Sequence, residues 1–298
     1  MTISAPDCSP ANLAASVSRF APSPSGLLHL GHAYSAMVAW NTARDLGGHM
    51  LLRIEDIDST RCRPEFELAI FEDLEWLGLT WNEPVIRQSD RLDQYGHALA
   101  SLHRLGVTYP CFCTRRQIQQ ELSTLRSAPH QQTPSYAGTC RELGSAERQN
   151  KIDAGIPHSI RLHLDTALAL MPQELSWVET DGLSYLAKDT PIGDEILARK
   201  DIGTSYHIAV VVDDASQGVD LVVRGEDLRN STGIHRILQE LLGLPQPCYL
   251  HHKLITDSEN RRLAKRDGAR AIRKLREEDR VSPGDVWRSL GFQPPETL

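Results

Sequence analysis

A chain of 298 residues exceeds the usual size of one compact domain, so we expect a principal core with smaller modules joined to it or inserted in it. Its 40% hydrophobic and 24% charged residues are ordinary for a globular protein, and the sequence shows neither a membrane-length apolar run nor a secretory start, which favours a cytoplasmic protein without a membrane partner. The net charge of −7 argues against a broad, nonspecific nucleic-acid binder.

The first segments in chain order predict a βαβ unit. Residues 17–21 and 50–54 are expected to be strands, and residues 33–46, with apolar side chains three and four apart, are expected to form the helix between them. Two more helices are predicted from the same spacing, one carrying Phe66, Ile70, Leu74 and Leu77 and the other Leu92, Tyr95, Leu99, Leu102 and Leu105. This order is typical of the start of a parallel nucleotide-binding sheet.

Residues 106–190 differ in character and are interpreted as an insertion, because they hold a cysteine cluster and a polar stretch. The regular pattern resumes with two β-prone runs, 208–212 and 219–223, and a helix near 232–242, which we interpret as the second half of the same sheet. The predicted organisation is a flexible extension (1–16), the two halves of the core domain (17–105 and 191–247), the insertion (106–190) and a C-terminal region with a strand, a basic loop and a short helical end (248–298).

A short histidine motif, His29-Leu30-Gly31-His32, opens the first predicted helix directly after a strand and a turn. Backbone N–H groups and the positive end of the helix would lie there beside two imidazoles, and Gly31 would let a phosphate approach closely. Simple helix capping is the alternative explanation. The position of the motif at a strand–helix joint favours binding of nucleotide phosphates.

Two longer stretches make a family resemblance specific. Residues 19–26 (Arg-Phe-Ala-Pro-Ser-Pro-Ser-Gly) and residues 53–61 (Arg-Ile-Glu-Asp-Ile-Asp-Ser-Thr-Arg) resemble glutamyl-tRNA synthetases, and the resemblance continues at 205–214 and 222–228. It covers nearly all of the chain from Arg19 onward. It implies the Rossmann-like, parallel-sheet α/β catalytic core of a class I aminoacyl-tRNA synthetase, with an inserted zinc-bearing subdomain and a short, stem-like C-terminal region.

The resemblance also assigns candidate substrate residues. Glutamate carries two carboxylates and an ammonium, so its site needs cations and an anion at fixed separation. The implied glutamate contacts are Arg19, Ala21, Ser23, Glu55, Tyr206 and Arg224, and the implied ATP contacts are His29, Gly31, His32, Glu226, Asp227, Leu228 and Lys265. Taken singly, each arginine is explained as well by a surface ion pair.

A strongly basic stretch follows Lys253-Leu254-Ile255. Residues 261–276 hold eight basic side chains against the single acid Asp267, and residues 262–266 (Arg-Leu-Ala-Lys-Arg) resemble the mobile Lys-Met-Ser-Lys-Ser motif that contacts ATP in class I synthetases. Lys265 matches the second lysine, whereas Arg262 and Ala264 depart from the pattern. The resemblance implies that His29, His32 and Lys265, with Mg²⁺, stabilise charge on the phosphates as pyrophosphate leaves.

Three of the six cysteines gather at Cys111, Cys113 and Cys140, which favours a structural zinc site over a disulfide scaffold. Buried free thiols are the alternative. Similarity to the short glutamyl-synthetase-like enzymes implies Tyr136 as the fourth ligand, and His130 is a competitor that spacing alone leaves open. The scattered Cys8, Cys62 and Cys248 are expected to be free thiols.

The sequence also predicts which molecule accepts the activated glutamate. Only 32 residues follow Arg266, so we expect no anticodon-binding domain of the glutamyl-tRNA synthetase kind. The size, the Cys-x-Cys arrangement and Val210 resemble the short enzymes of this group, which implies tRNA-independent glutamate activation and attachment of glutamate to queuosine, the modified wobble base of tRNA(Asp), by a monomer. The alternatives are a truncated glutamyl-tRNA synthetase acting on tRNA(Glu), a non-catalytic zinc or RNA-binding protein, and another nucleotidyltransferase.

Overall fold

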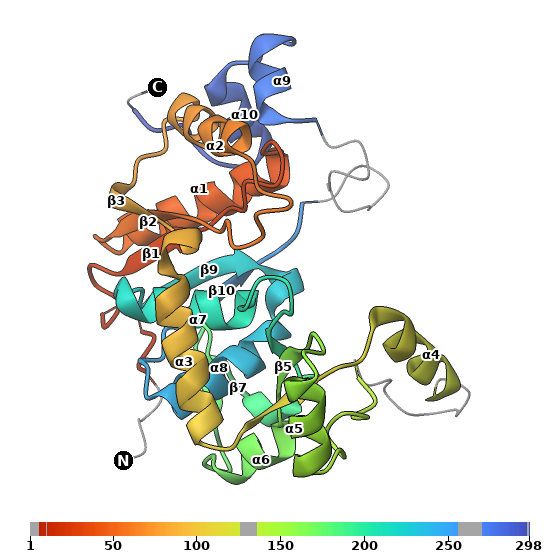
Figure 1. Ribbon diagram of the computed structural model, residues 1–298. Coiled ribbons are helices and arrows are strands. Elements are labelled where there is room, and N and C mark those ends of the chain that lie inside the picture. The colour runs from red at the N-terminus through yellow and green to blue at the C-terminus, as the bar shows by residue number, and fades with distance from the viewer. Residues whose placement is uncertain (1–5, 10, 126–135, 256–269, 297) are drawn as a thin grey trace.

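The computed structural model describes residues 6–9, 11–125, 136–255, 270–296 and 298 (Figure 1). Three parallel strands form its first sheet, in the order β1 (Val17–Phe20), β2 (His49–Ile54) and β3 (Asn82–Arg87). Helix α1 (Leu30–Asp45) joins β1 to β2, and helix α2 (Pro64–Trp76) lies between β2 and β3 in the chain. The predicted βαβ unit is therefore confirmed, whereas β3 was not predicted.

A second parallel pair continues this layer. Strands β9 (Leu221–Gly225) and β10 (Cys248–His252) pair in register, and helix α8 (Ser231–Leu242) connects them. The backbone N–H of Asp220, just before β9, donates to the carbonyl of Val17 at 3.2 Å. The pair therefore lies beside β1, so the carboxyl ends of β1 and β9 open at the same place (Figure 1).

The prediction of a strand at 208–212 was wrong, because these residues belong to helix α7 (Tyr206–Ser216). The helix packs against α3 (Leu92–Arg104) and α8, and its buried residues are Ile208, Ala209, Val210, Val211, Asp213 and Asp214. A helix covered on most sides needs no polar stripe, so its valine run has the composition of a buried strand. Tertiary packing has overridden the β propensity of valine and isoleucine.

The C-terminal helices α9 (Ile272–Glu277) and α10 (Pro283–Ser289) pack on the far end of the first half. The indole N–H of Trp287 donates to the carbonyl of Leu77 at 2.8 Å, and its ring meets that of Trp40 on α1 edge to face. These helices complete the apolar core that α1 and α2 share with the first sheet.

In the chain, smaller elements come between the two halves of the parallel layer. Strands β4 (Thr108–Cys111), β5 (Ser159–Leu162) and β8 (Ile196–Ala198) form an antiparallel sheet, and β6 (Ser176–Val178) and β7 (Ser184–Leu186) form a hairpin. The associated helices are α4 (Arg115–Leu125), α5 (Ser145–Asp153) and α6 (Leu164–Ala169). Figure 1 shows α4 and α5 away from β1–β3. Because β8 lies beyond Thr190, this sheet extends past the boundary predicted for the insertion.

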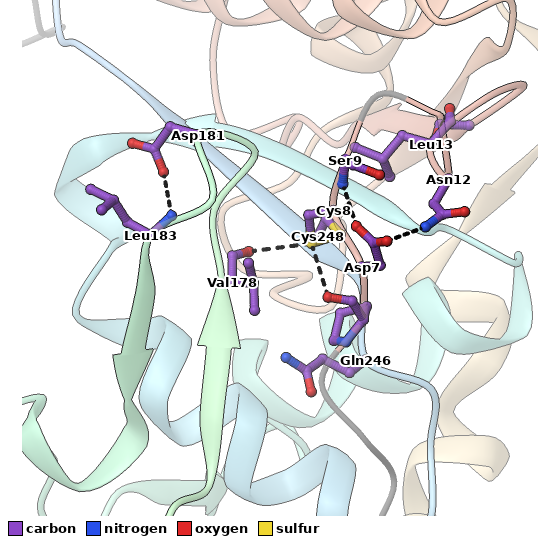
Figure 2. Close-up of a disulfide and its surroundings, with 12 residues drawn as sticks. Asp7, Cys8, Ser9, Asn12, Leu13, Val178, Asp181, Leu183, Gln246 and Cys248 are labelled. Carbon is purple, nitrogen blue, oxygen red and sulfur yellow. Dashed lines mark hydrogen bonds between the residues drawn. A yellow bond between two sulfur atoms is a disulfide. The ribbon is translucent and has the colours of Figure 1, made fainter.

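Cys8 and Cys248 form a disulfide, so the expectation that both are free thiols was wrong (Figure 2). They are 240 residues apart in sequence, and only the fold brings them together. Cys8 and Leu13 are both about 5% exposed and belong to the main core, whereas the sequence had predicted a flexible extension. Cys62 is a free thiol, as expected. No helix within the described residues is long and apolar enough to cross a membrane.

Candidate active site

The two histidines of the motif lie at the start of α1. His29 is the N-cap, its Nδ1 accepts from the backbone N–H of Gly31 at 3.2 Å, and its own N–H donates to His32 Nδ1 at 3.2 Å. The two imidazole rings lie 3.8 Å apart, centre to centre. This reciprocal cap satisfies backbone donors and holds both rings at the positive end of the helix. The motif therefore caps the helix, and phosphate binding by its two imidazoles stays a prediction.

A cavity of about 240 Å³ opens at the carboxyl ends of β1, β2 and β9. It brings together most of the residues predicted to bind substrates: Arg19, Ala21, His29, Gly31, His32, Glu55, Tyr206, Arg224, Asp227 and Leu228. Glu226, which begins the 3-10 helix η3 (Glu226–Leu228), does not line it. Lys265, Arg262 and Ala264 lie outside the described residues.

One wall of this cavity is a buried cluster of charges. Asp214 at the end of α7 accepts from Arg19 Nε at 3.0 Å and from Arg53 at 2.8 Å. Glu55 lies 3.7 Å from Arg53, and burial raises the pKa of its carboxyl to about 7 although Arg53 and Arg19 favour the charged form. Arg19 is therefore already paired with a carboxylate, while a bound cation would favour the ionised form of Glu55.

Arg224 also lines this cavity and is surrounded by neutral groups. Its guanidinium donates to Thr232 Oγ1 at 2.7 Å, to His235 Nδ1 and His251 Nε2 at 3.1 Å each, and to the hydroxyl of Tyr206 at 3.4 Å. It is 4% exposed, and within the described parts of the chain no carboxylate lies within salt-bridge distance of it. A buried cation without a counter-charge is suited to bind an anionic group.

A second, larger cavity of about 540 Å³ adjoins the first and shares Glu55 and Tyr206 with it. Ser23, predicted as a glutamate contact, lines this second cavity and lies 3.6 Å from the sulfur of Cys62. Arg61 and Arg199 also line it. The two cavities therefore share part of their lining, and arginines and acids both line the second one, among them Arg199 paired with Asp58.

Several polar residues of the site were missed in the sequence, namely Arg53, His207, Asp213, Asp214, Thr232, His235 and His251. Asp213 accepts from Arg91, Tyr95 and Gln88, which ties α7 to α3 and to the 3-10 helix η1 (Gln88–Arg91) before it. The paired aspartates after a valine run were a usable signal, because buried acids need cationic partners. The histidines have no fixed spacing, and no local pattern marks them.

The cysteine cluster lies in the inserted part. None of its four donors lines either cavity, but Arg161 and Ile118, which line the second cavity, contact it. The sulfurs of Cys111, Cys113 and Cys140 lie within 4.8 Å of one another, and the hydroxyl of Tyr136 is 3.4 Å from Cys111 and 3.5 Å from Cys113. Three thiols and one phenol thus converge on one point, which is a donor set that could hold a tetrahedral zinc ion. His130, the competing ligand, lies outside the described residues.

Comparison with known proteins gives consistent similarities. Residues 16–288 match the family described as tRNA synthetases class I (E and Q), catalytic domain. The chain is 47% identical over 285 residues to a protein of Rhodobacter capsulatus named glutamyl-Q tRNA(Asp) synthetase, covering 93% of this chain and 100% of that one. It is 44% identical over 251 residues to the protein of the same name from Nocardia farcinica, covering 84% of this chain and 76% of the relative.

Among solved structures, a glutamate tRNA ligase from Elizabethkingia meningosepticum in complex with its amino acid is similar, with a TM-score of 0.71 and 29% identity. The match covers 85% of this chain and 52% of that one, so the chain spans about half the length of that ligase. The parallel layer and the match agree on a class I synthetase catalytic fold.

Proposed function

The chain belongs to the glutamyl-Q tRNA(Asp) synthetase family of class I synthetases, and on that premise we propose that it activates glutamate with ATP, without tRNA, and transfers it to queuosine in tRNA(Asp). It is a ligase-type enzyme of this class. The observation that carries the proposal is one cavity that Arg19, Glu55, Tyr206 and Arg224 line together with the histidine-bearing start of α1. A dicarboxylate amino acid and a nucleotide therefore have adjoining places.

Glutamate is proposed to bind through charge complementarity. Arg224 would hold a carboxylate, because its guanidinium is buried among neutral acceptors. Glu55 would face the ammonium, which favours the ionised form of this carboxyl over its protonated one. Arg19 would support the other carboxylate from its ion pair with Asp214. Ala21, Ser23 and Tyr206 would complete the surface around the amino acid.

The proposed reaction has two steps without a covalent enzyme intermediate. The α-carboxylate of glutamate attacks the α-phosphorus of ATP and pyrophosphate leaves, while His29, His32, Lys265 and the amides at the start of α1 stabilise the phosphate charge. Mg²⁺ would arrive with the ATP phosphates and supply further positive charge. A hydroxyl of the queuosine cyclopentene ring then attacks the mixed anhydride, which releases AMP.

The experiment that tests the acceptor uses labelled glutamate with tRNA(Asp) containing or lacking queuosine, and with tRNA(Glu) as a control. We expect label only on queuosine-containing tRNA(Asp), located in the anticodon fragment after nuclease digestion. Label at the 3′ end of tRNA(Glu) would instead identify a glutamyl-tRNA synthetase. Absence of glutamate-dependent pyrophosphate exchange would show that the chain is not catalytic.

We also propose that Cys111, Cys113, Cys140 and Tyr136 bind one structural zinc ion. The support is their convergence: a zinc–sulfur bond of about 2.3 Å places tetrahedral thiolates about 3.7 Å apart, and the sulfurs of Cys113 and Cys140 are 3.4 Å apart. The N–H of Phe112 donates to the Cys140 sulfur at 3.3 Å, which suits a thiolate. The ion would hold the loop after β4 against the segment carrying Tyr136.

A further inference from the structure

His251 on β10 connects Arg224 to a buried carboxylate. Its Nε2 accepts from Arg224 Nε at 3.1 Å, and its Nδ1 lies 2.6 Å from Oε1 of Glu179, which comes directly after β6. The side chain of His251 is fully buried and that of Glu179 is 5% exposed. Arg229 also reaches Glu179 at 2.8 Å. Neither Glu179 nor His251 lines the substrate cavity, whereas Arg224 does.

The chemistry of arginine determines which ring nitrogen of His251 and of His235 carries the proton. A guanidinium has no lone pair to offer, so each imidazole nitrogen that faces Arg224 must accept. His251 therefore carries its proton on Nδ1 and donates it to Glu179. His235 accepts from Arg224 on Nδ1, so its proton is on Nε2, which lies 3.1 Å from Nδ1 of His207. One tautomer of each histidine satisfies all of these contacts.

The histidines around Arg224 are neutral at physiological pH. Burial lowers the pKa of His251, lowers that of His235 well below its usual range, and lowers that of His207 to about 4. These histidines consequently do not change the positive charge of Arg224, which can interact with an anionic ligand. Uncharged acceptors set the orientation of its planar guanidinium group.

We propose that Glu179 and His251 are positioning residues that orient the guanidinium of Arg224 toward the carboxylate of glutamate. This inference rests on the proposed function of Arg224. An arginine side chain is flexible, and a two-pronged contact to a carboxylate requires both prongs in place. Glu179 sets the tautomer of His251, and His251 then accepts at one edge of the guanidinium while Thr232 accepts at another. The β6–β7 hairpin of the inserted part thereby contributes to substrate recognition.

The test compares variants that keep either the hydrogen bond of residue 251 to Glu179 or its hydrogen bond to Arg224. His251→Asn can still donate to Glu179 from the place of Nδ1 but has no acceptor for Arg224, whereas His251→Gln places an acceptor near Nε2. Glu179→Gln removes the charge that sets the tautomer. In glutamate-dependent pyrophosphate exchange we expect His251→Asn and Glu179→Gln to raise the KM for glutamate about tenfold or more with the KM for ATP unchanged, and His251→Gln to restore much of the loss.

Glu240→Gln is the matched control, because Glu240 is another largely buried acid paired with an arginine, Arg236, at 2.7 Å. It should leave the KM for glutamate unchanged. A purely structural role would lower the melting temperature and the active fraction without moving that KM. A KM for glutamate within about twofold of the parent in both His251→Asn and Glu179→Gln would overturn the inference.

A measurement that needs no activity separates this inference from the proposed function. The ¹⁵N shifts of the His251 ring, assigned by loss of the signal in His251→Asn, report which nitrogen carries the proton. We expect the proton on Nδ1 in the parent and a change toward the other tautomer in Glu179→Gln. A parent with its proton on Nε2 would refute the inference even if glutamate were activated. A parent with the expected tautomer but no exchange with glutamate would refute the proposed function alone.

Discussion

Arg19 and Arg224 are both about 4% exposed, yet they differ in what surrounds them. Arg19 has a carboxylate partner in Asp214, so much of its charge is already balanced. Arg224 has hydroxyl and imidazole acceptors, which satisfy its N–H groups without cancelling its charge. Burying the charge of Arg224 without a counter-charge costs free energy in the unliganded protein, and a bound anion offsets this cost. We therefore expect Arg224 to contribute more to glutamate affinity than Arg19.

Glu55 provides a prediction about pH. Because its folded pKa of about 7 exceeds the ordinary 4.5, the folded protein keeps this proton over a range where the unfolded chain has lost it. This group therefore contributes less and less to the free energy of unfolding as pH rises from 4.5 to 7. Glu55→Gln should raise the stability of the unliganded protein above pH 7 by about 3 kcal/mol at most, while abolishing glutamate activation.

The measurement is the melting temperature of the parent and of Glu55→Gln at several pH values between about 5 and 8. The difference should be small at the acidic end and grow toward neutrality. A difference that is the same at every pH, or largest in acid, would contradict the assignment of a raised pKa to Glu55.

At single positions, the sequence indicated the cavity-lining residues that belong to contiguous motifs. It did not indicate the residues that only the fold brings together. Arg19 and Arg224 lie near the carboxyl ends of β1 and β9, and Glu55 directly follows β2, so their convergence on one cavity could be expected. His251 and Glu179 are 72 residues apart, and only the pairing of the hairpin with β10 brings them together. No local pattern encodes such a contact.

At the scale of elements, helix α7 explains where pattern reading fails. Its apolar run, residues 208–212, has the composition and the length of a buried strand, although the helix itself spans 11 residues. Besides packing against α3 and α8, the helix places Asp213 and Asp214 at its end, where they meet Arg53, Arg91 and Arg19. These partners come from three other segments, so the evidence for a helix lies outside the window that a periodicity argument uses.

Helix α8 is predicted to tolerate no side chain at Gly233. A Cβ built there would lie 1.8 Å from the hydroxyl of Thr190 and 2.7 Å from Ile192, so Gly233→Ala forces the segment after η2 (Ala187–Asp189) away from the helix. We expect a loss of about 1–3 kcal/mol in the free energy of unfolding, measured by denaturant titration.

Gly96 is the matched control on α3. It is exposed, and nothing lies within 4 Å of a Cβ built on it, so Gly96→Ala should stabilise the protein by about 0.5–1 kcal/mol through helix propensity. Equal effects of the two substitutions would show that α8 does not pack as closely as described.

The cysteine cluster, which joins the end of β4 to the segments carrying Tyr136 and Cys140, provides a prediction about bound metal. If the four donors hold zinc, Cys140→Ser should lose most of the bound metal, measured by elemental analysis of the purified protein, because a hydroxyl is a poor substitute for a thiolate. Cys62→Ser, which changes a free thiol outside the cluster, should retain it. Full zinc occupancy in Cys140→Ser would remove Cys140 from the ligand set.

At the scale of the whole molecule, the disulfide connects parts that are distant in sequence. The sulfur of Cys8 lies 3.9 Å from the carbonyl oxygen of Val178, and Cys248 begins β10, so the disulfide lies where the N-terminal segment, the β6–β7 hairpin and the parallel layer meet (Figure 2). Glu179 and His251 follow one and three residues after these contacts. The bond thus lies close to the elements that position Arg224.

We predict that breaking this bond lowers stability without unfolding the protein. A cross-link closing a long loop typically contributes about 2–4 kcal/mol by restricting the unfolded chain. Cys8→Ser should therefore melt at a lower temperature than the parent, and a dithiol reductant should lower the parent to the same value while leaving Cys8→Ser unchanged. If the parent melts at one temperature with and without reductant, Cys8 and Cys248 are not bonded.

The disulfide also makes the covalent chain a ring with a long C-terminal tail, besides residues 1–7 before Cys8. The ring runs from Cys8 to Cys248 and contains β1 through α8, and with them Arg19, Glu55, Tyr206 and Arg224. The tail carries α9, α10 and the stretch with Lys265. A single peptide cleavage inside the ring opens it but leaves one covalent molecule until the disulfide is reduced, whereas a cleavage in the tail releases a fragment at once. A protease digest run with and without reductant can therefore assign each nick to the ring or to the tail from its gel mobility alone.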